Sequence, residues 1–521
     1  MDDLQRQASQ SQADATLVLA GPGSGKTTML AGRVRWLVEA GEDPSRILCL
    51  TFSRKASLAM RSKIGLPAVT ISTFHAFCLA LMRERADLFG PAASDIVGDD
   101  RRAASLAQFV GEAAFDRLDE IDIAREKGAL GALAKEYDRA LAADGKVDFA
   151  GMALRIVART QEDSEFAAWL GRRFSEVLVD EYQDVSPVQE NLVQLLADQG
   201  ARVWAVGDDD QSLYEFRAAD VRRIIDFGRA FAGACIVSAT ANYRCSAAIV
   251  EAARRLIGHN RARVGKATVA KAGTDGFVVV RGYQDDRCEA AAIGRAVRRM
   301  IASGVPAREI AILARTNGLA QFLAREVPEV VSMTCHASKG LEWDYCFVAG
   351  CEDGVTPAAG APIEEERRVF YVAATRARIG VSFSYATKRF GRQCFRSSFL
   401  DELGVEEKAG QTPSLDDVGM VSVARRLPKW LDPGGERRFG DLERETRNAM
   451  QGRPERSGTK WSVEDDIGLE DLVIRRIAPA EMARLLKRTV AETVSRVEAR
   501  GLVSAPDVGR LLFDRSRPRA S

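Results

Sequence analysis

One stretch of the chain, residues 16–40 (TLVLAGPGSGKTTMLAGRVRWLVEA), joins an apolar run, a glycine-rich loop and a helical pattern. The apolar run 16–20 predicts a strand, and Gly41 follows the helical pattern as a residue that ends a helix. The apolar side chains of the helical part recur at the spacing of one buried face, at Leu30, Val34, Leu37 and Val38. The next apolar run, 46–52 (RILCLTF), predicts a second strand. This order of elements predicts a βαβ unit and therefore a parallel sheet.

The loop at residues 20–27 (AGPGSGKT) follows the phosphate-binding pattern G-x-x-x-x-G-K-[ST], with Ala20 in the first place. Its glycines let the backbone turn tightly and point N–H groups at phosphate oxygens, and the helix that starts near Lys26 adds its positive end. In this pattern the lysine reaches the β- and γ-phosphates, and the hydroxyl of Thr27 ligates Mg²⁺. We expect the nucleotide site to contain Ala20, Gly21, Pro22, Gly23, Ser24, Gly25, Lys26, Thr27 and Thr28. An ordinary glycine-rich turn is the alternative, which the strand before the loop and the helix after it disfavour.

Residues 175–187 (SEVLVDEYQDVSP) place clustered carboxylates at the end of a short apolar strand pattern. An unpaired buried charge is costly, so either a cation binds there or the acids reach solvent. A magnesium nucleotide needs a strand-end carboxylate opposite the loop threonine, and Asp180 fits that place. Glu181 is then the expected general base that positions and activates the attacking water. A solvated acidic turn is the alternative.

The composition limits the class of protein. With 46% hydrophobic and 28% charged residues, this chain of 521 residues is ordinary for a globular protein and long enough for several cores. The net charge of +1 counts mildly against a nucleic-acid binder, because a polyanion would need a local basic surface. Nine scattered cysteines, none in a CxxC pair, predict reduced thiols in a cytoplasmic protein. No apolar run approaches the roughly 18 residues of a membrane span, so we expect no contact with a membrane.

Strand and helix patterns divide the chain into four parts. We predict a first α/β domain from 1–85 and 166–231, an α-helical insert at 86–165, a second α/β domain at 232–404 and a C-terminal extension of unknown role at 405–521. Strand-like runs support the two α/β domains: EVLVDE (176–181), RVWAVGD (202–208), GFVVVRGY (276–283), EIAILART (309–316), VVSMTCH (330–336) and YCFVAG (345–350).

The predicted C-terminal extension has two parts. Residues 405–475 are charged and carry Pro and Gly, as a linker does. Residues 479–500 have the pattern of an amphipathic helix that begins near Pro479 and ends at Gly501.

Besides the phosphate loop, eight motifs occur in a fixed order: LQRQA (4–8), TFSRKASLAMRSKI (51–64), TISTFHAF (70–77), DEYQD (180–184), VGDDDQSLYEFRAA (206–219), NYRCS (242–246), TCHASKGLEWD (334–344) and EEERRVFYVAATRAR (364–378). The series resembles the UvrD/Rep-type superfamily 1 DNA helicases. Any one motif is weak evidence, whereas all of them in order are specific. The resemblance implies an α/β fold with two RecA-like parallel-sheet motor domains, ATP and Mg²⁺ as cofactors, and single-stranded DNA and its junctions with duplex DNA as partners.

The resemblance assigns catalytic roles to both α/β domains. Arg244 and Arg376 match the two arginine fingers of the family, a kind of residue worth about 10³–10⁵ in rate. Both lie in the second domain, whereas Lys26, Asp180 and Glu181 lie in the first, so that ATP would be held between two domains that part after hydrolysis. Read alone, either arginine would more often be a surface ion pair, and Arg376 falls on a predicted helix.

The resemblance also implies contacts with the rest of the nucleotide and with DNA. Gln5 would recognise adenine and Tyr243 would stack on it, although Tyr243 alone would more often be a core residue. Glu342 would accept a hydrogen bond from the ribose, and Gln211 would sense the γ-phosphate. A protein that moves on any sequence grips the backbone and stacks on bases. The residues that the resemblance assigns to the DNA channel are Phe52, His75, Phe216, Arg217 and His336.

The chain departs from the family in three places. UvrD/Rep helicases carry a large accessory domain inside the second motor domain, but here Asn317 and Thr334 are only 17 residues apart. Thr28 stands where relatives often carry an arginine that packs on the base. Ala218 and Ala219 replace a more usual Gly-Ala pair.

Two functions of different classes follow. The leading hypothesis is an ATP-dependent 3′–5′ translocase and helicase on single-stranded DNA, of the kind used in DNA repair. The second is a DNA-dependent ATPase that acts as a sensor or loader subunit of a repair, plasmid or anti-phage complex, with a protein partner bound through 405–521. A fused nuclease is a weaker idea, since the acids at 462–472 lack a nuclease pattern. RNA as the substrate stays open.

Overall fold

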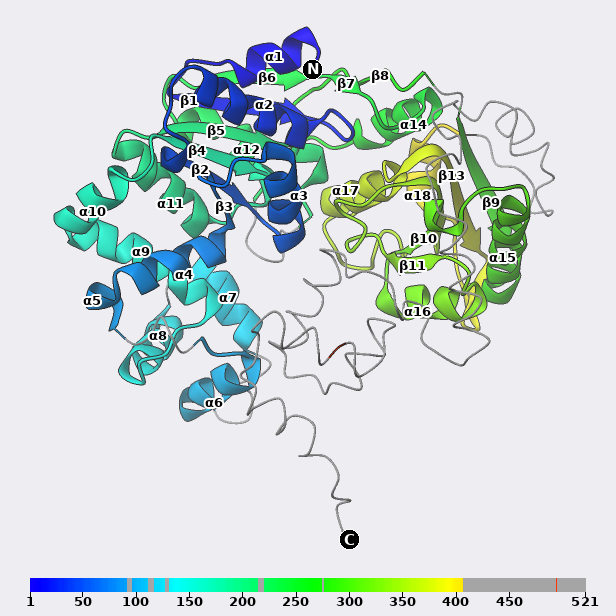
Figure 1. Ribbon diagram of the computed structural model, residues 1–521. Helices are drawn as coiled ribbons and strands as arrows, with labels where there is room; N and C mark the ends of the chain where they lie inside the picture. Colours follow the sequence, from blue (N-terminus) through cyan, green and yellow to red (C-terminus); the bar gives the residue numbers. More distant parts are fainter. Residues whose placement is uncertain are drawn as a thin grey trace. The chain divides into compact units, whose positions relative to one another are not determined.

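The computed structural model contains two parallel β-sheets flanked by helices (Figure 1). The described residues are 1–90, 96–110, 117–126, 131–213, 220–273 and 276–405, together with Thr493. The α/β fold with two RecA-like domains is therefore confirmed. Apart from Val405 and Thr493, the predicted linker at 405–475 and the predicted helix at 479–500 lie outside the described residues.

The first sheet has six strands in the order β3-β2-β4-β5-β1-β6, and every pair is parallel. Its strands are β1 (Ala15–Ala20), β2 (Ile47–Thr51), β3 (Thr70–Thr73), β4 (Glu176–Asp180), β5 (Arg202–Gly207) and β6 (Cys235–Ala239). Side chains alternate between two cores, as a pleated strand requires. Leu17 and Leu19 of β1 join one core, and Val18 and Ala20 join the other. Two covered faces explain why these strands are apolar runs without a polar side.

Helices cover both faces of the first sheet. One core is built with α1 (Asp3–Ser9), α2 (Lys26–Glu39) and α3 (Arg54–Ile64). The other core contains side chains of α4 (Phe74–Glu84), α9 (Phe149–Glu162), α10 (Ser164–Gly171), α11 (Pro187–Asp198) and α13 (Phe227–Ala230). Phe74 and Phe77 of α4 are buried in this core.

The region predicted as an α-helical insert is helical. It contains α5 (Ala86–Phe89), α6 (Asp99–Val110), α7 (Leu118–Glu126) and α8 (Ala132–Ala143), followed by α9 and α10. Leu106, Ile121, Tyr137 and Leu141 form a small core of their own. In contrast, α9 and α10 pack under the first sheet, so the last part of the insert is built into the first domain.

The second sheet has five parallel strands in the order β11-β10-β12-β13-β9. Its strands are β9 (Phe277–Tyr283), β10 (Ile310–Ala314), β11 (Val331–Thr334), β12 (Trp343–Ala349) and β13 (Ala377–Ala386). One face is covered by α14 (Ala247–Ile257), α17 (Ile363–Ala374) and α18 (Ser398–Glu402), and the other by α15 (Asp286–Ala302) and α16 (Asn317–Glu326). The short elements are η1 (Pro44–Arg46), η4 (Tyr182–Asp184), η5 (Asp209–Gln211), α12 (Arg222–Ile225), β7 (Ala241–Asn242), β8 (Val269–Ala270), η7 (Ala307–Glu309), β14 (Lys388–Arg389) and β15 (Arg392–Gln393).

The structure adds strands that the sequence patterns did not single out. β3 has the polar sequence TIST, and β6 is a half-exposed edge strand, so neither is a clear apolar run. Because β6 belongs to the first sheet, the predicted boundary at 231/232 falls before the last strand of that sheet. The physical reason is that edge strands cover little core and carry weak apolar patterns.

The segment between Asn317 and Thr334 has no room for an inserted domain. It consists of α16, the connection 327–330 and β11. β10 and β11 are direct neighbours in the sheet, joined through this helix as in an ordinary parallel crossover. All nine cysteines are free thiols, as expected. Among the described residues, no helix has the length and apolar character needed to cross a bilayer.

We predict that Gly276→Ala destabilises the second domain. A Cβ at position 276 would overlap the carbonyl oxygen of Ile379 and the hydroxyl of Ser246, where β9 meets β13 and α14. Such overpacking costs about 1–3 kcal/mol, so the melting temperature should fall. The matched control is Gly318→Ala in α16, where a Cβ meets no atom within 4 Å. It should leave the melting temperature equal or slightly higher, and equal melting of both variants would contradict the prediction.

Candidate active site

The predicted nucleotide residues of the first domain follow three strands of one parallel sheet. Parallel strands end at a common edge, where ligand sites of such sheets form. The glycine-rich loop follows β1, Asp180 and Glu181 stand at the end of β4, and Asp208 follows β5. The strand order β4-β5-β1 places these three ends side by side. The fold therefore gathers motifs that are far apart in the sequence.

The glycine-rich loop depends on two glycines in the left-handed region. Gly23 has a φ of 67° and Gly25 a φ of 83°, values that L side chains rarely adopt. Gly25 is the N-cap of α2, so the free N–H groups of the first helical turn lie beside the loop and favour an anion there. The amide Nε2 of Gln5 donates to the carbonyl oxygen of Ser24 at 2.8 Å and joins α1 to the loop. This arrangement fits a phosphate group, with Lys26 at the start of α2.

A lysine stands beside the unusual threonine of the loop. The ammonium group of Lys63, in α3, donates to the Thr28 hydroxyl at 2.6 Å. Lys63 therefore brings a positive charge from another element next to the loop. Lys63 lies inside the motif at 51–64, but its contact with Thr28 joins two different helices and is not visible in the sequence.

Asp180 and Glu181 form an acidic pair in which Asp180 is buried and Glu181 is partly buried. Glu181 has a φ of 52°, so the chain turns sharply between the two carboxylates in a conformation that costs energy for a side chain of this kind. Burial, together with the charge of Glu181, raises the pKa of Asp180 to about 7. Burial also opposes the charge on Glu181, but Lys26 and Lys339 outweigh it and hold the pKa of Glu181 below its usual value. Glu181 thus keeps the ionised form that a general base needs.

The carboxylates fit a divalent cation. Burial is the main cause of the raised pKa of Asp180, and the charge of Glu181 adds to it, whereas Lys26 and Lys339 act in the opposite direction. Oδ1 of Asp184, four residues further on, is buried and accepts no hydrogen bond. Hard oxygen ligands of this kind suit Mg²⁺, and the Thr27 hydroxyl at the end of the loop is of the same chemistry. Thr27 and Asp180 therefore remain the residues predicted to hold the metal.

In the second domain the site residues come from the amino ends of the strands. Glu342 directly precedes β12, and Arg376 directly precedes β13. The N–H of Trp343 donates to the carbonyl oxygen of Arg376 at 3.0 Å and fixes the two turns together. The prediction that Arg376 lies on a helix is wrong, because α17 ends at Ala374 and β13 begins at Ala377, after only two intervening residues.

Arg376 is a buried cation with few partners. Its side chain is among the largest that are fully buried, and its Nη2 donates to Oε1 of Gln211 at 3.2 Å. It also donates to the carbonyl oxygens of Val372 at 3.0 Å and Leu341 at 3.2 Å, and to the hydroxyl of Thr375 at 3.4 Å. Burial and the nearby charge of Arg244 lower the pKa of Arg376 to about 10. Arg376 is therefore not part of a surface ion pair, and an anion bound beside it would be stabilised.

Arg244 and Tyr243 lie against the glycine-rich loop. The N–H of Tyr243 donates to the carbonyl oxygen of Gly23 at 2.9 Å, and its hydroxyl donates to Asp2 at 2.6 Å. The ring of Tyr243 is 46% exposed, so it is not a core residue. Nε of Arg244 pairs with a carboxylate oxygen of Glu342 at 2.6 Å. The structure therefore places the predicted base, ribose and finger residues near one another.

Lys339 is a site residue that the sequence analysis did not single out, although it lies inside the motif at 334–344. Its ammonium group donates to the carbonyl oxygen of Gln211 at 2.8 Å and pairs with Asp184. It belongs to the second domain and neutralises acids of the first. The signal that could have found it is the need of a buried carboxylate cluster for a positive partner.

Two predicted DNA residues lie at the same edge of the first sheet. Phe52 follows β2, and His75 lies in the first turn of α4, directly after β3. A further aromatic ring, Phe149, lies beside His75 with a centroid distance of 5.7 Å and an edge-to-face angle of 75°. Phe149 is 53% exposed, which is unusual for a phenylalanine at the start of a helix. The sequence analysis missed it, because its contact with His75 spans the helical insert.

The remaining DNA predictions have different outcomes. His336 follows β11 in the second domain and is partly buried, and burial lowers the pKa of its imidazole. Phe216 and Arg217 lie outside the described residues, as do Ala218 and Ala219.

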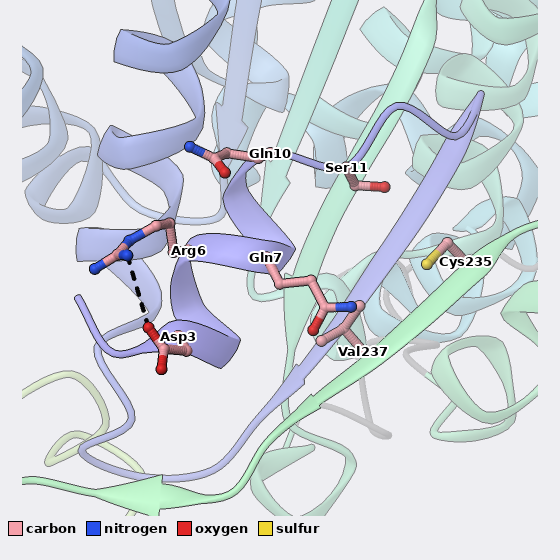
Figure 2. Close-up of a pocket in the computed structure, with 7 residues that line it drawn as sticks. All are labelled: Asp3, Arg6, Gln7, Gln10, Ser11, Cys235 and Val237. Carbon is pink, nitrogen blue, oxygen red and sulfur yellow. Dashed lines mark ion pairs between the residues drawn. The ribbon is translucent and has the colours of Figure 1, made fainter.

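A separate hollow lies between α1 and the edge strand β6 (Figure 2). It is lined by Asp3, Arg6, Gln7, Gln10, Ser11, Cys235 and Val237. None of the residues predicted to bind nucleotide lines it. Arg6 and Asp3 form an ion pair at 3.6 Å, and both of these side chains are exposed. This hollow is therefore distinct from the candidate active site.

Comparison with known protein families gives two matches. The model of the UvrD/REP helicase N-terminal domain matches residues 1–123 and 101–232. The model of the UvrD-like helicase C-terminal domain matches residues 320–388. These ranges contain all strands of the two sheets except β6, β9 and β10.

Three similar curated proteins carry related names. ATP-dependent DNA helicase UvrD2 of Mycobacterium tuberculosis is 26% identical, over 82% of this chain and 84% of its own length. ATP-dependent DNA helicase UvrD1 of Mycobacterium leprae is 30% identical, over 61% of this chain and 47% of its own length. ATP-dependent DNA helicase PcrA of Staphylococcus epidermidis is 28% identical, over 62% and 49%. The alignments with UvrD1 and PcrA thus span about half of those proteins.

We predict that Lys26→Ala abolishes productive nucleotide binding. The variant removes the one charged side chain of the loop that reaches toward phosphate, and losing such a stabilising group costs about 10²–10³ in rate. ATP hydrolysis and the affinity for a fluorescent ATP analogue are the measurements. Lys135→Ala, at an exposed position of α8, is the matched control and should behave as the unchanged protein. Unaltered turnover of Lys26→Ala would show that the loop is not the phosphate site.

Proposed function

Because the chain belongs to the UvrD/Rep family of ATP-dependent DNA helicases, we propose that it is an ATP-driven motor that moves 3′ to 5′ along single-stranded DNA and separates duplex strands. The observation that carries the proposal is the contact of Arg376 with Gln211 at 3.2 Å. It joins the amino edge of the second sheet to the carboxyl edge of the first. A nucleotide bound at the first edge would touch both domains, which is the requirement for coupling hydrolysis to domain movement.

Residues of the first domain would bind and hydrolyse ATP. Lys26 neutralises the β- and γ-phosphates, and Thr27 and Asp180 hold the magnesium ion, which stabilises the charge on the phosphates. Glu181 positions water and accepts its proton. The lowered pKa of Glu181, caused by Lys26 and Lys339 against the effect of burial, supports this role.

Residues of the second domain would complete the site. Arg376 and Arg244 stabilise the charge that develops on the γ-phosphate, and Gln211 connects Arg376 to the first domain. The ion pair with Glu342 fixes the guanidinium group of Arg244. The neighbouring backbone is held at the loop, because the N–H of Tyr243 donates to the carbonyl oxygen of Gly23. Tyr243, Gln5 and Glu342 would contact the base and ribose.

The proposed DNA path uses rings at the carboxyl edge of the first sheet. Phe52, His75 and the exposed ring of Phe149 offer aromatic faces or edges to unstacked bases, a sequence-independent mode of binding. His336 would contribute from the second domain. Phe216 and Arg217 complete the proposed set.

A second candidate is an ATPase that does not unwind DNA alone. The observation in its favour is the connection of four residues, 327–330, where helicases of this family carry their accessory domain. In that case the chain would sense or load single-stranded DNA within a complex, with a protein partner at 405–521. Strand displacement separates the two candidates.

We expect the full chain to hydrolyse ATP faster with single-stranded DNA than without it, and to displace a labelled strand from a duplex with a 3′ overhang but not from one with a 5′ overhang. The measurement is gel-resolved strand release at fixed ATP. Stimulated hydrolysis without release from either substrate would support the second candidate. Hydrolysis that is indifferent to DNA would contradict both.

We predict that Arg376→Ala lowers DNA-stimulated kcat by about 10³-fold or more, as expected of an arginine finger. The KM for ATP should change less, because the loop and Gln5 are untouched. Arg325→Ala in α16, an exposed arginine, is the control and should keep full activity. Equal losses in binding and turnover would instead indicate a general defect of folding.

We predict that Phe149→Ala weakens binding to single-stranded DNA, since one base stacked on an aromatic ring contributes about 1–3 kcal/mol. ATP hydrolysis without DNA should be unchanged. Phe390→Ala, an equally exposed phenylalanine of the second domain, is the control. Fluorescence anisotropy of a labelled oligonucleotide measures the difference, and equal affinities of the two variants would exclude Phe149 from the DNA path.

A further inference from the structure

The three consecutive aspartates Asp208, Asp209 and Asp210 follow β5 and are almost fully buried. Adjacent buried carboxylates repel one another and require positive partners. The sequence analysis quoted them within a motif and gave them no role. Their partners come from the segment 263–266, which follows α14 and is far away in the sequence.

Each aspartate has at least one partner in this segment, and the ammonium group of Lys266 pairs with all three. The ammonium group of Lys266 donates to Asp208 at 2.7 Å and also pairs with Asp209. The N–H of Val264 donates to the Asp209 carboxylate at 2.7 Å. Arg263 forms a two-pronged pair with Asp210, at 2.9 and 2.8 Å. Burial opposes these charges, yet the aspartates hold the pKa of Lys266 above its usual value, and Lys266 helps to hold that of Asp208 below.

The residues just before this segment, 260–262, are fixed to the second domain. The side chain of Arg367 donates to Oδ1 of Asn260 at 2.6 Å, and Arg368 donates to the carbonyl oxygen of Ala262 at 2.7 Å. Both arginines belong to α17, the helix that leads to Arg376. The segment therefore connects α17 with the aspartates.

Asp208 is linked to both candidate catalytic groups. Its carboxylate accepts from Nε2 of Gln211, so that Oε1 of Gln211 faces Arg376. Its backbone N–H donates to Oε1 of Gln183 at 2.9 Å, and Nε2 of Gln183 donates to Glu181 at 2.6 Å. Because an amide can present either its oxygen or its nitrogen, the charge of Asp208 decides which end of Gln211 meets the arginine.

We propose that Lys266 is a positioning residue for ATP hydrolysis: by holding the Asp208 carboxylate it orients Gln211 toward Arg376, and so transmits the position of α17 to the catalytic groups. This inference rests on the proposed function. Lys266 itself contacts no substrate, and its side chain is only 3% exposed. Its effect is expected in turnover and not in the affinity for nucleotide.

The test compares steady-state ATP hydrolysis with saturating single-stranded DNA for the full chain and its variants. Lys266→Met should lower kcat by about 10–100-fold, the usual loss when a partner of an active-site ligand is removed, with little change in KM. Lys266→Arg should restore part of the loss. Lys271→Met, an exposed lysine just beyond β8, is the control and should stay within about twofold of the unchanged protein.

A double-mutant cycle with Gln211→Ala separates positioning from a structural role. If Lys266 acts through Gln211, adding Lys266→Met to Gln211→Ala lowers kcat no further. If the two losses multiply, or if Lys266→Met leaves kcat unchanged, the inference is wrong. An unchanged protein without DNA-stimulated hydrolysis would instead refute the proposed function, so the two failures are distinguishable.

A second variant covers the case in which Lys266→Met does not fold. Lys266→Met combined with Asp209→Asn keeps the net charge of the buried cluster and still removes the donor to Asp208. Its kcat should be lower than that of Asp209→Asn alone by the same 10–100-fold. Equal kcat values of these two variants would overturn the inference.

Discussion

The structure of the candidate site depends on compensation of buried negative charge. Asp180, Asp184 and Asp208 are buried and Glu181 is partly buried at the carboxyl edge of the first sheet, where isolated carboxylates would be very costly. Their compensation is divided: Lys26 is local, whereas Lys339 and the segment 263–266 come from later in the chain. Burial still raises the pKa of Asp180, and a divalent cation bound there would stabilise its carboxylate.

The two sheets contribute opposite edges to this charge arrangement. In the first sheet, the loops after parallel strands carry the predicted phosphate-binding residues and the acidic residues. In the second, Glu342 and Arg376 stand before their strands. A parallel sheet has all its carboxyl ends on one side and all its amino ends on the other, so each domain offers its site residues as one group. The two groups of residues differ in charge, and this difference would favour their closing around a bound anion.

Sequence patterns located most of this architecture and part of the site. Buried parallel strands are apolar runs, so β1, β2, β4, β5 and β9 to β12 were predictable, whereas the polar β3 and the half-exposed β6 were not. β13 was missed because only Thr375 and Arg376 separate it from α17, with no Gly or Pro between. Lys63 and Lys339 lie inside quoted motifs and Lys266 lies outside them, but the sequence shows the partner of none of the three. Their roles arise from tertiary contacts, which a linear sequence does not display.

Position 23 illustrates how the two domains constrain each other's evolution. Gly23 needs its left-handed φ for the loop, and a Cβ there would also collide with Arg244 and lie 2.8 Å from Oδ1 of Asn242. The left-handed φ serves the predicted phosphate-binding loop, and the absence of a Cβ allows the loop to pack closely against the turn at 242–244. A related protein that no longer binds nucleotide would still need glycine at position 23 for this packing. Its persistence in a degenerate relative is therefore no evidence of surviving hydrolysis.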